Sequence, residues 1–233
     1  MSHQVIQLKV EEHDNFIHII FDPKTKAAAV VDPAWDAEGI REVLKEEGLY
    51  LDAILITHAD HDHINAIKAL YGKKTTLFIH PLEAKRFDCP KDAVLVEHGD
   101  EIMLGGSSIT VLHTAGHTAG SCCFLTDHHL ITGDTLFMYG AGNVRGETGD
   151  AKALFKSLQA LKRLNPTLTV WCGHDYGVVE HSTLGEQLAG NPFLLIEHEE
   201  DFVRYREHIA AQTRKTPYAP ISREALQQIL DTH

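Results

Sequence analysis

The sequence has few cysteines, no long apolar run and no excess of positive charge. Four of the 233 residues are cysteine, and Cys89, Cys122, Cys123 and Cys172 form neither a Cys-x-x-Cys pair nor a disulfide framework. Residues 1–10 lack the basic and then apolar pattern of a secretion signal, and no apolar run is long enough to span a bilayer. We therefore expect a cytoplasmic protein with reduced, structural cysteines.

The charge balance is acidic, and it excludes some partners. The chain carries 21 Lys and Arg against 33 Asp and Glu, a formal net charge of −12. Such a chain repels phosphate backbones and anionic membranes, so we expect no nucleic-acid or membrane partner and a small-molecule substrate instead. The oligomeric state is left open. The 17 histidines exceed what packing needs, which directs attention to metal-ligand spacing.

Hydrophobic patterning predicts an α/β protein. Short strands are expected at Val5–Val10, Phe16–Phe21, Ala28–Val31, Ala53–Ile56, Leu77–His80, Ala93–Val96, Ile109–His113, Cys122–Leu125, His129–Ile131 and Leu168–Trp171. Helices are expected after Asp36, from about Ile64 to Gly72, after Asp150, and in a tail over residues 182–233. Strand clusters that give way to strand–helix alternation predict layered packing. We expect a single domain over residues 1–233.

The densest chemical signal follows a short, buried strand. His58, Asp60, His61, Asp62 and His63 fall within six positions, and each side chain can donate nitrogen or oxygen to a divalent ion. In an extended segment alternate residues share a face, so the first imidazole and the two carboxylates are expected to converge. His61 is expected to point away, and a helix that starts at His63 turns that side chain back. A metal site is therefore predicted here.

Three later residues complete the predicted site. His117, Asp134 and His174 each follow a glycine at the end of a predicted strand. A glycine permits a tight turn and a close approach of the backbone. One Gly-His or Gly-Asp pair is a weak signal, but three of them at strand ends are a strong one. We expect these three side chains to meet the histidine cluster.

Together these motifs resemble the metallo-β-lactamase superfamily, whose first motif is His-x-His-x-Asp-His, and within it the glyoxalase II branch, the hydroxyacylglutathione hydrolases. The resemblance runs from about residue 5 to 200, with specific stretches at Asp52–His63, Thr114–Gly120, Thr132–Phe137, Cys172–Tyr176, Ser182–Glu186 and Asn191–Phe193. It implies a four-layer αββα sandwich with a short helical C-terminal tail. The site is then expected at the shared edge of the two sheets.

The resemblance also implies a binuclear site, most simply with two Zn²⁺. The first ion would be held by His58, Asp60 and His117, the second by Asp62, His63 and His174, with Asp134 as the bridge. Paired ions lower the pKa of a bound water, so metal-bound hydroxide would be the nucleophile. Asp62 is the candidate catalytic residue, because it would also orient that water. The implied reaction is hydrolysis of a small thioester or ester.

Position 60 departs from the family pattern, which usually has histidine there. A carboxylate adds negative charge and a harder oxygen donor, which favours Fe or Mn more than a histidine-rich site would. Alternatively Asp60 does not coordinate, which leaves His58, His117 and Asp134 around one ion. Two histidines and a carboxylate are typical of non-haem iron oxygenases, and persulfide dioxygenases of this superfamily use that set with a single Fe. A third alternative is a non-catalytic metal-binding or sensor protein.

The substrate side departs as well. The glyoxalase II branch commonly has Gly-Cys-Gly and a basic residue after the Asp134 segment, whereas this chain has Gly140–Asn143 without the cysteine or the base. Arg145 lies two residues on, and no basic residue directly follows the Asn-Pro-Phe segment. Asn143, Arg145 and Tyr176 are the predicted substrate contacts. With so few cations, a glutathione carboxylate would gain little.

Overall fold

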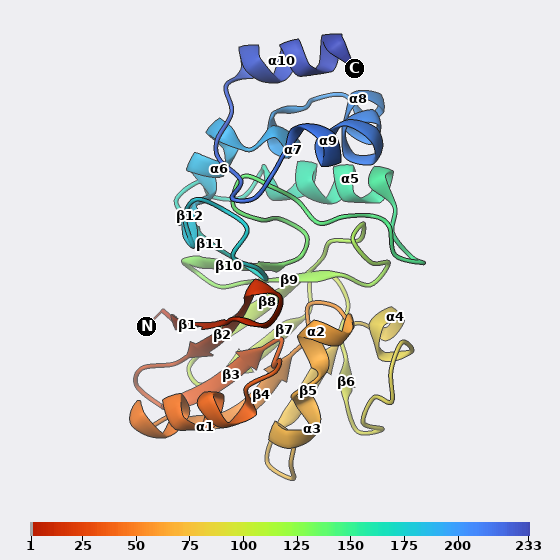
Figure 1. The fold of residues 1–233 in the computed structure, drawn as a ribbon. Coiled ribbons are helices and arrows are strands. Elements are labelled where there is room, and N and C mark those ends of the chain that lie inside the picture. Colours follow the sequence, from red (N-terminus) through yellow and green to blue (C-terminus); the bar gives the residue numbers. More distant parts are fainter. Residues whose placement is uncertain (1) are drawn as a thin grey trace.

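The computed structural model describes residues 2–233 and shows two β-sheets packed face to face, with helices over both outer faces (Figure 1). Strands of the first sheet lie in the order β1-β2-β3-β4-β5-β6, and those of the second in the order β12-β11-β10-β9-β8-β7. Both sheets are mixed, because β3 to β6 pair in parallel, as do β10 and β11, while the other pairs are antiparallel. The four-layer αββα sandwich is confirmed.

The strands are short. The first sheet contains β1 (Gln4–Val10), β2 (Asn15–Phe21), β3 (Ala27–Val31), β4 (Tyr50–Leu55), β5 (Thr76–Ile79) and β6 (Val94–Leu95). The second sheet contains β7 (Glu101–Leu104), β8 (Ser107–His113), β9 (Cys122–Leu125), β10 (His129–Gly133), β11 (Thr169–Cys172) and β12 (His181–Thr183).

The helices fall into two groups. Those of the first half are α1 (Ala37–Glu46), α2 (His61–Ile64), α3 (Ile67–Leu70) and α4 (Pro81–Ala84), with the 3-10 turn η1 (Glu12–Asp14). Those of the second half are α5 (Ala151–Leu161), α6 (Leu184–Gly190), α7 (Pro192–Leu195), α8 (Glu199–Arg204), the π-helical η2 (Tyr205–Ile209), α9 (Ala210–Thr213) and α10 (Arg223–Thr232).

Three apolar layers hold the sandwich together. One lies between the two sheets and includes Leu55 and Phe124, both fully buried. A second lies between the first sheet and its helices around Ile40, and a third lies between the second sheet and its helices around Leu158. Burial of such apolar area is the main favourable term in folding. Adjacent Cys122 and Cys123 face different layers, as the alternation along a strand requires.

The helix predicted after the histidine cluster differs from the structure. It begins at His61 rather than near Ile64, and it is split into α2 and α3. The two capped helices were predicted well, since Asp36 accepts a hydrogen bond from the backbone N–H of Gly39 and Asp150 caps α5. Strands β7 and β12 and helix α4 were missed, because each is too short to show a period.

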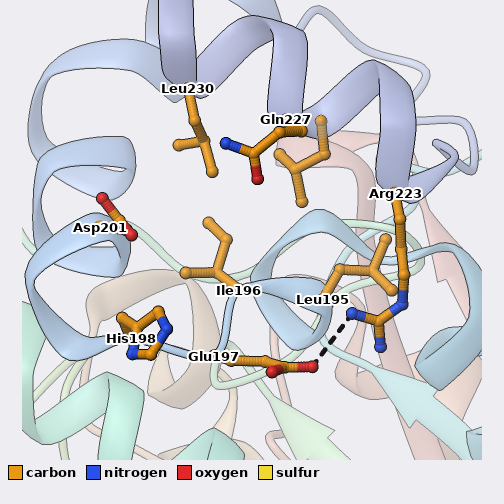
Figure 2. A pocket seen from close by; sticks show the side chains of 9 residues that line it. Leu195, Ile196, Glu197, His198, Asp201, Arg223, Gln227 and Leu230 are labelled. Carbon is orange, nitrogen blue, oxygen red and sulfur yellow. Dashed lines mark hydrogen bonds and ion pairs between the residues drawn. The ribbon is translucent and has the colours of Figure 1, made fainter.

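The C-terminal segment is mainly helical, as predicted, although it begins with strand β12. Its outermost helix, α10, lies over α7 and leaves a cavity of about 200 Å³ between them (Figures 1 and 2). The apolar side chains of Leu195, Ile196 and Leu230 line this cavity, and an ion pair of 3.1 Å joins Glu197 to Arg223 at its side (Figure 2). None of the predicted metal ligands lines it.

Candidate metal centre

The predicted ligands gather at one edge of the sandwich, where the two sheets are joined. The backbone N–H of Cys122 donates to the carbonyl of Thr57 over 2.8 Å, and that of Phe16 donates to the carbonyl of Gly173, also over 2.8 Å. These bonds bring the ends of β4 and β11 against strands of the opposite sheet. The loops that follow them carry ligands, so side chains from both sheets face one point.

A first group of donor atoms contains His58, Asp60 and His117, all within 4.8 Å of one another. Oδ2 of Asp60 lies 3.3 Å from Nε2 of His117 and 3.8 Å from Nε2 of His58. Both imidazoles are buried, while Asp60 is partly exposed. Asp60 therefore lies beside His58 and His117, as predicted from the motif, although the family usually has histidine at this position.

A second group contains Asp62, His63 and His174, again within 4.8 Å. The Nε2 atoms of the two imidazoles are 3.3 Å apart, and each lies 3.5–3.7 Å from Oδ2 of Asp62. Asp134 lies between the groups, with Oδ2 at 3.3 Å from Nε2 of His174 and at 3.7 Å from Nε2 of His117. All seven predicted ligands are thus brought together.

One detail predicted from the sequence is wrong. Asp62 was expected to share a face with His58 and Asp60 by strand alternation. Because the helix already starts at His61, Asp62 is turned toward His63 and His174 instead. His61 is exposed and packs against the edge of Trp35, so its expected orientation away from the site is confirmed.

All four imidazoles donate through Nδ1 to a fixed oxygen. The acceptors are Oγ1 of Thr57 for His58 at 3.0 Å, Oδ2 of Asp32 for His63 at 3.1 Å, and the carbonyls of Asn143 and His13 for His117 and His174 at 2.7 and 2.9 Å. This fixes the ring orientation, and in the neutral imidazole it leaves Nε2 with a lone pair that faces the centre. Such an arrangement is typical of metal-ligating histidines.

Three buried atoms of the site have no hydrogen-bond partner among residues 2–233. They are Nε2 of His58, Nε2 of His117 and Oδ1 of Asp134. Buried polar atoms without a partner are rare, since each carries a desolvation penalty of about 1–3 kcal/mol. All three are electron-pair donors aimed into the same space. The donor set therefore fits a divalent cation.

The electrostatics agree with this fit. Burial lowers the pKa of His58 well below its usual value, so that imidazole is neutral and able to ligate. Burial also lowers the pKa of His63, but the Asp134 carboxylate and the hydrogen bond to Asp32 outweigh it and raise this pKa to about 9. The clustered carboxylates thus attract positive charge, which a bound cation supplies.

The glycines before the ligands allow the close approach that the sequence predicted. Gly133 has φ +47°, and a Cβ there would collide with the hydroxyl of Thr57. A Cβ at Gly173 would collide with Oδ1 of Asp134 and come within 3.0 Å of Cε1 of His63. Only glycine fits at position 133 without moving Thr57, the partner of His58, and at position 173 without moving Asp134.

Sequence reasoning missed the carboxylates and the arginine that support the ligands. Asp32, at the end of β3, binds the backbone and hydroxyl of Thr57 as well as His63. Glu83 is completely buried, and Arg86 joins it to Asp60. An Asp before Pro33 at a strand end was the signal for Asp32. Nothing in the sequence pattern marks the other two.

A cavity of about 310 Å³ is connected to the centre through Asn143, which lines it and whose carbonyl accepts the hydrogen bond from His117. The predicted contacts Asn143 and Arg145 line it, together with Tyr139, Phe193, Arg206, Ala210, Ala211, Arg214 and Tyr218. Two of these arginines, Arg206 and Arg214, come from the C-terminal segment and were not predicted from the sequence. Tyr176 does not line this cavity, but it stacks on His174 at 4.7 Å and meets the edge of Tyr218.

The fold and the site define a class of protein. The chain belongs to the metallo-β-lactamase superfamily, whose family model matches residues 17–174. Across residues 2–233, no helix combines the length and the apolar character needed to cross a membrane. The donor set of the site supports a metal cofactor, and one relative described below is named a zinc-dependent hydrolase.

The chain is similar to several individual proteins over most of its length. The chain is 32% identical over 211 residues to the probable polyketide biosynthesis zinc-dependent hydrolase BaeB of Bacillus velezensis, an alignment that covers 88% of this chain and 93% of that one. It is 33% identical over 218 residues to a hydroxyacylglutathione hydrolase of Aliivibrio fischeri, with 92% and 81% covered. The crystal structure of ETHE1 from Myxococcus xanthus superposes with a TM-score of 0.80 at 27% identity, covering 99% and 100%. The resemblance to hydroxyacylglutathione hydrolases is confirmed.

Proposed function

We propose that the protein is a metal-dependent hydrolase of a small thioester or ester, with a binuclear site. His58, Asp60 and His117 would hold the first ion, Asp62, His63 and His174 would hold the second, and Asp134 would contribute to both. The observation that carries this proposal is the convergence of seven donor side chains, three of which have a buried atom without a hydrogen-bond partner in the described part of the chain. The zinc-dependent and hydroxyacylglutathione hydrolases among the relatives support it.

The ions supply Lewis acidity for the substrate carbonyl and a water that ionises near neutral pH. The protein positions the side chains that would hold these ions. Its four imidazoles are oriented through Nδ1, so their Nε2 atoms are held ready without reorganisation. The Asp62 side chain is 24% exposed, whereas those of His63 and His174 are 1% and 4% exposed. We propose that Asp62 orients the attacking water.

The remainder of the substrate lies in the arginine-lined cavity. Arg145, Arg206 and Arg214 line it in a chain that is otherwise strongly acidic. Arg206 and Arg214 each donate to backbone carbonyls, among them those of Ala141 and Tyr139, so their guanidinium groups are held in place. An acyl group near Tyr176 and a polar or anionic arm at the arginines is the substrate that this arrangement favours.

Two measurements test the proposal together. Protein purified without added ions is expected to contain two divalent ions per chain by elemental analysis. It is also expected to release thiol from S-lactoylglutathione or from a simple acyl thioester. Asp134→Ala should lose both ions and turnover, while Asp127→Asn, in an exposed hairpin turn, should keep both.

Other results would reject the proposal. One iron per chain with oxygen consumption on glutathione persulfide would replace it with the dioxygenase alternative. Bound metal without turnover on any thioester or ester would favour the sensor alternative. Full metal content in Asp134→Ala would contradict the ligand assignment itself.

A further inference from the structure

The two oxygens of Asp60 face different partners. Oδ2 points at the imidazoles of His117 and His58, at 3.3 and 3.8 Å. Oδ1 accepts a hydrogen bond of 2.6 Å from Nη2 of Arg86. One oxygen is thus directed into the centre and the other is held outside it. A carboxylate in this state can give an ion only one oxygen without breaking a charge-assisted bond.

Arg86 is itself fixed by a buried carboxylate. Its Nη1 donates to Oε2 of Glu83 over 2.6 Å, and Glu83 has no exposed surface. The same Glu83 accepts from the backbone N–H of Ala59 at 2.7 Å and from the Thr118 hydroxyl and the Gly120 N–H at 2.8 and 3.0 Å. Glu83 therefore ties the loop of His58 and Asp60 to the loop of His117, and Arg86 extends this tie to Asp60.

We propose that Arg86, anchored by Glu83, is the positioning residue that makes Asp60 a one-oxygen ligand of the first ion, in the place where the family has an imidazole. The inference rests on the proposed ligand set, because it takes Asp60 to be a ligand. Arg86 would act on the orientation and on the charge of the Asp60 carboxylate. An aspartate that replaces a histidine adds a negative charge and a second donor oxygen, and the guanidinium compensates the charge and occupies that oxygen.

A purely structural role for Arg86 makes a different prediction. In that case Arg86 matters only because it neutralises Glu83 and holds helix α4, and its loss would affect the site whatever residue stands at position 60. In the positioning role its loss affects metal binding only when residue 60 is a carboxylate. Replacing Asp60 by histidine therefore separates the two roles.

The experiment compares Arg86→Gln in two backgrounds, the natural chain and Asp60→His. The affinity of each site for Zn²⁺ and Mn²⁺ is measured by chelator competition on the full chain, and the visible spectrum of the Co²⁺ form reports coordination. We expect Arg86→Gln to lower the affinity for one of the two ions about 10–100-fold in the natural chain. We expect a change under about 3-fold in the Asp60→His background. Arg86→Lys, which keeps the charge, should recover part of the loss.

The matched control is Arg204→Gln, because Arg204 forms an ion pair with Asp201 at the same three-residue spacing. Equal losses of metal affinity in both backgrounds, or none in the natural chain, would overturn the inference. Thermal unfolding of the metal-free variants separates a folding defect from a site defect, and Arg86→Lys serves if the glutamine variant does not fold. Asp60→Ala tests the premise: if it keeps both ions at full affinity, the proposed ligand set fails and the inference fails with it. If Asp60→Ala loses one ion and Arg86→Gln loses none, only the inference fails.

Discussion

Oδ2 of Asp32 accepts a hydrogen bond from Nδ1 of His63 over 3.1 Å, and this bond turns Nε2 of that imidazole toward the metal centre. The other oxygen of Asp32 accepts from the backbone N–H of Thr57 over 2.7 Å. Asp32→Asn removes one of the two acceptor oxygens, because an amide accepts only through its carbonyl. We expect affinity for the second ion to fall about 10–100-fold, since partners of ligating histidines typically have effects of that size.

Chelator competition with Zn²⁺ checks this prediction, with Asp127→Asn as the control. Asp127 is exposed in the turn before β10, so its amide variant should bind metal as the natural chain does. An Asp32→Asn protein with unchanged affinity for both ions would show that His63 needs no such orientation.

Gly173 gives a steric test of the same centre. A Cβ at this position would collide with Oδ1 of Asp134, while Gly146 has no atom within 4 Å of such a Cβ. We expect Gly173→Ala to displace the Asp134 carboxylate and to lose metal content, and to destabilise the fold by about 1–3 kcal/mol through overpacking. Gly146→Ala should do neither. Elemental analysis and thermal unfolding check both variants, and full metal content in Gly173→Ala would argue against a bridging position for Asp134.

The contrast between these positions shows how much the sequence alone could predict. The ligands follow strands and glycines, and both signals are local, so His117, Asp134 and His174 are recognisable from the order of residues. Glu83 is recognisable only by what it touches, since a buried carboxylate looks like any other acidic residue in a sequence. The helix start at His61 was misplaced by a few residues because the cluster's polar residues hide the helical period.

Other residues could not be predicted because they are far apart in the sequence. Arg206 and Arg214 reach the cavity beside Arg145 from helices that lie about 60 residues later in the sequence. No pattern near Asn143 indicates these two arginines, so their place in this cavity was not predicted from the sequence. Packing of the C-terminal helices against the second sheet brings these arginines into place.

The packing of α5 can be tested by a cavity mutation. Leu158 is fully buried in the layer between the second sheet and its helices, and Lys156, on the same helix, is exposed. Leu158→Ala is expected to lower the free energy of unfolding by about 2–5 kcal/mol, whereas Lys156→Ala should change it by less than about 0.5 kcal/mol. Denaturant unfolding measures both. A loss under about 1 kcal/mol in Leu158→Ala would mean that the layer is loosely packed.

The buried histidine of β2 should make stability depend on pH. His18 is 2% exposed, its Nε2 lies 3.1 Å from Oε1 of Gln7, and its ring meets that of Trp171. Burial lowers the pKa of His18 from 6.5 to about 3. Between those two values the unfolded chain binds a proton that the folded chain does not, so stability is full above about pH 6.5 and falls as the pH decreases toward 3. This histidine alone should remove about 2 kcal/mol of stability between pH 8 and pH 5.

His18→Gln removes the titrating group and keeps a polar side chain beside Gln7. Unfolding of the metal-free protein is measured at pH 8 and pH 5, so that loss of bound ions does not contribute, and the change is compared between the variant and the natural chain. The variant should lose less stability over this range, by about the same 2 kcal/mol, even if it is less stable at pH 8. His208→Gln, which changes an exposed histidine, should follow the natural chain. If all three proteins show the same change between the two pH values, His18 is protonated in the folded state as readily as in the unfolded state. Its burial then excludes water less completely than its 2% exposure indicates.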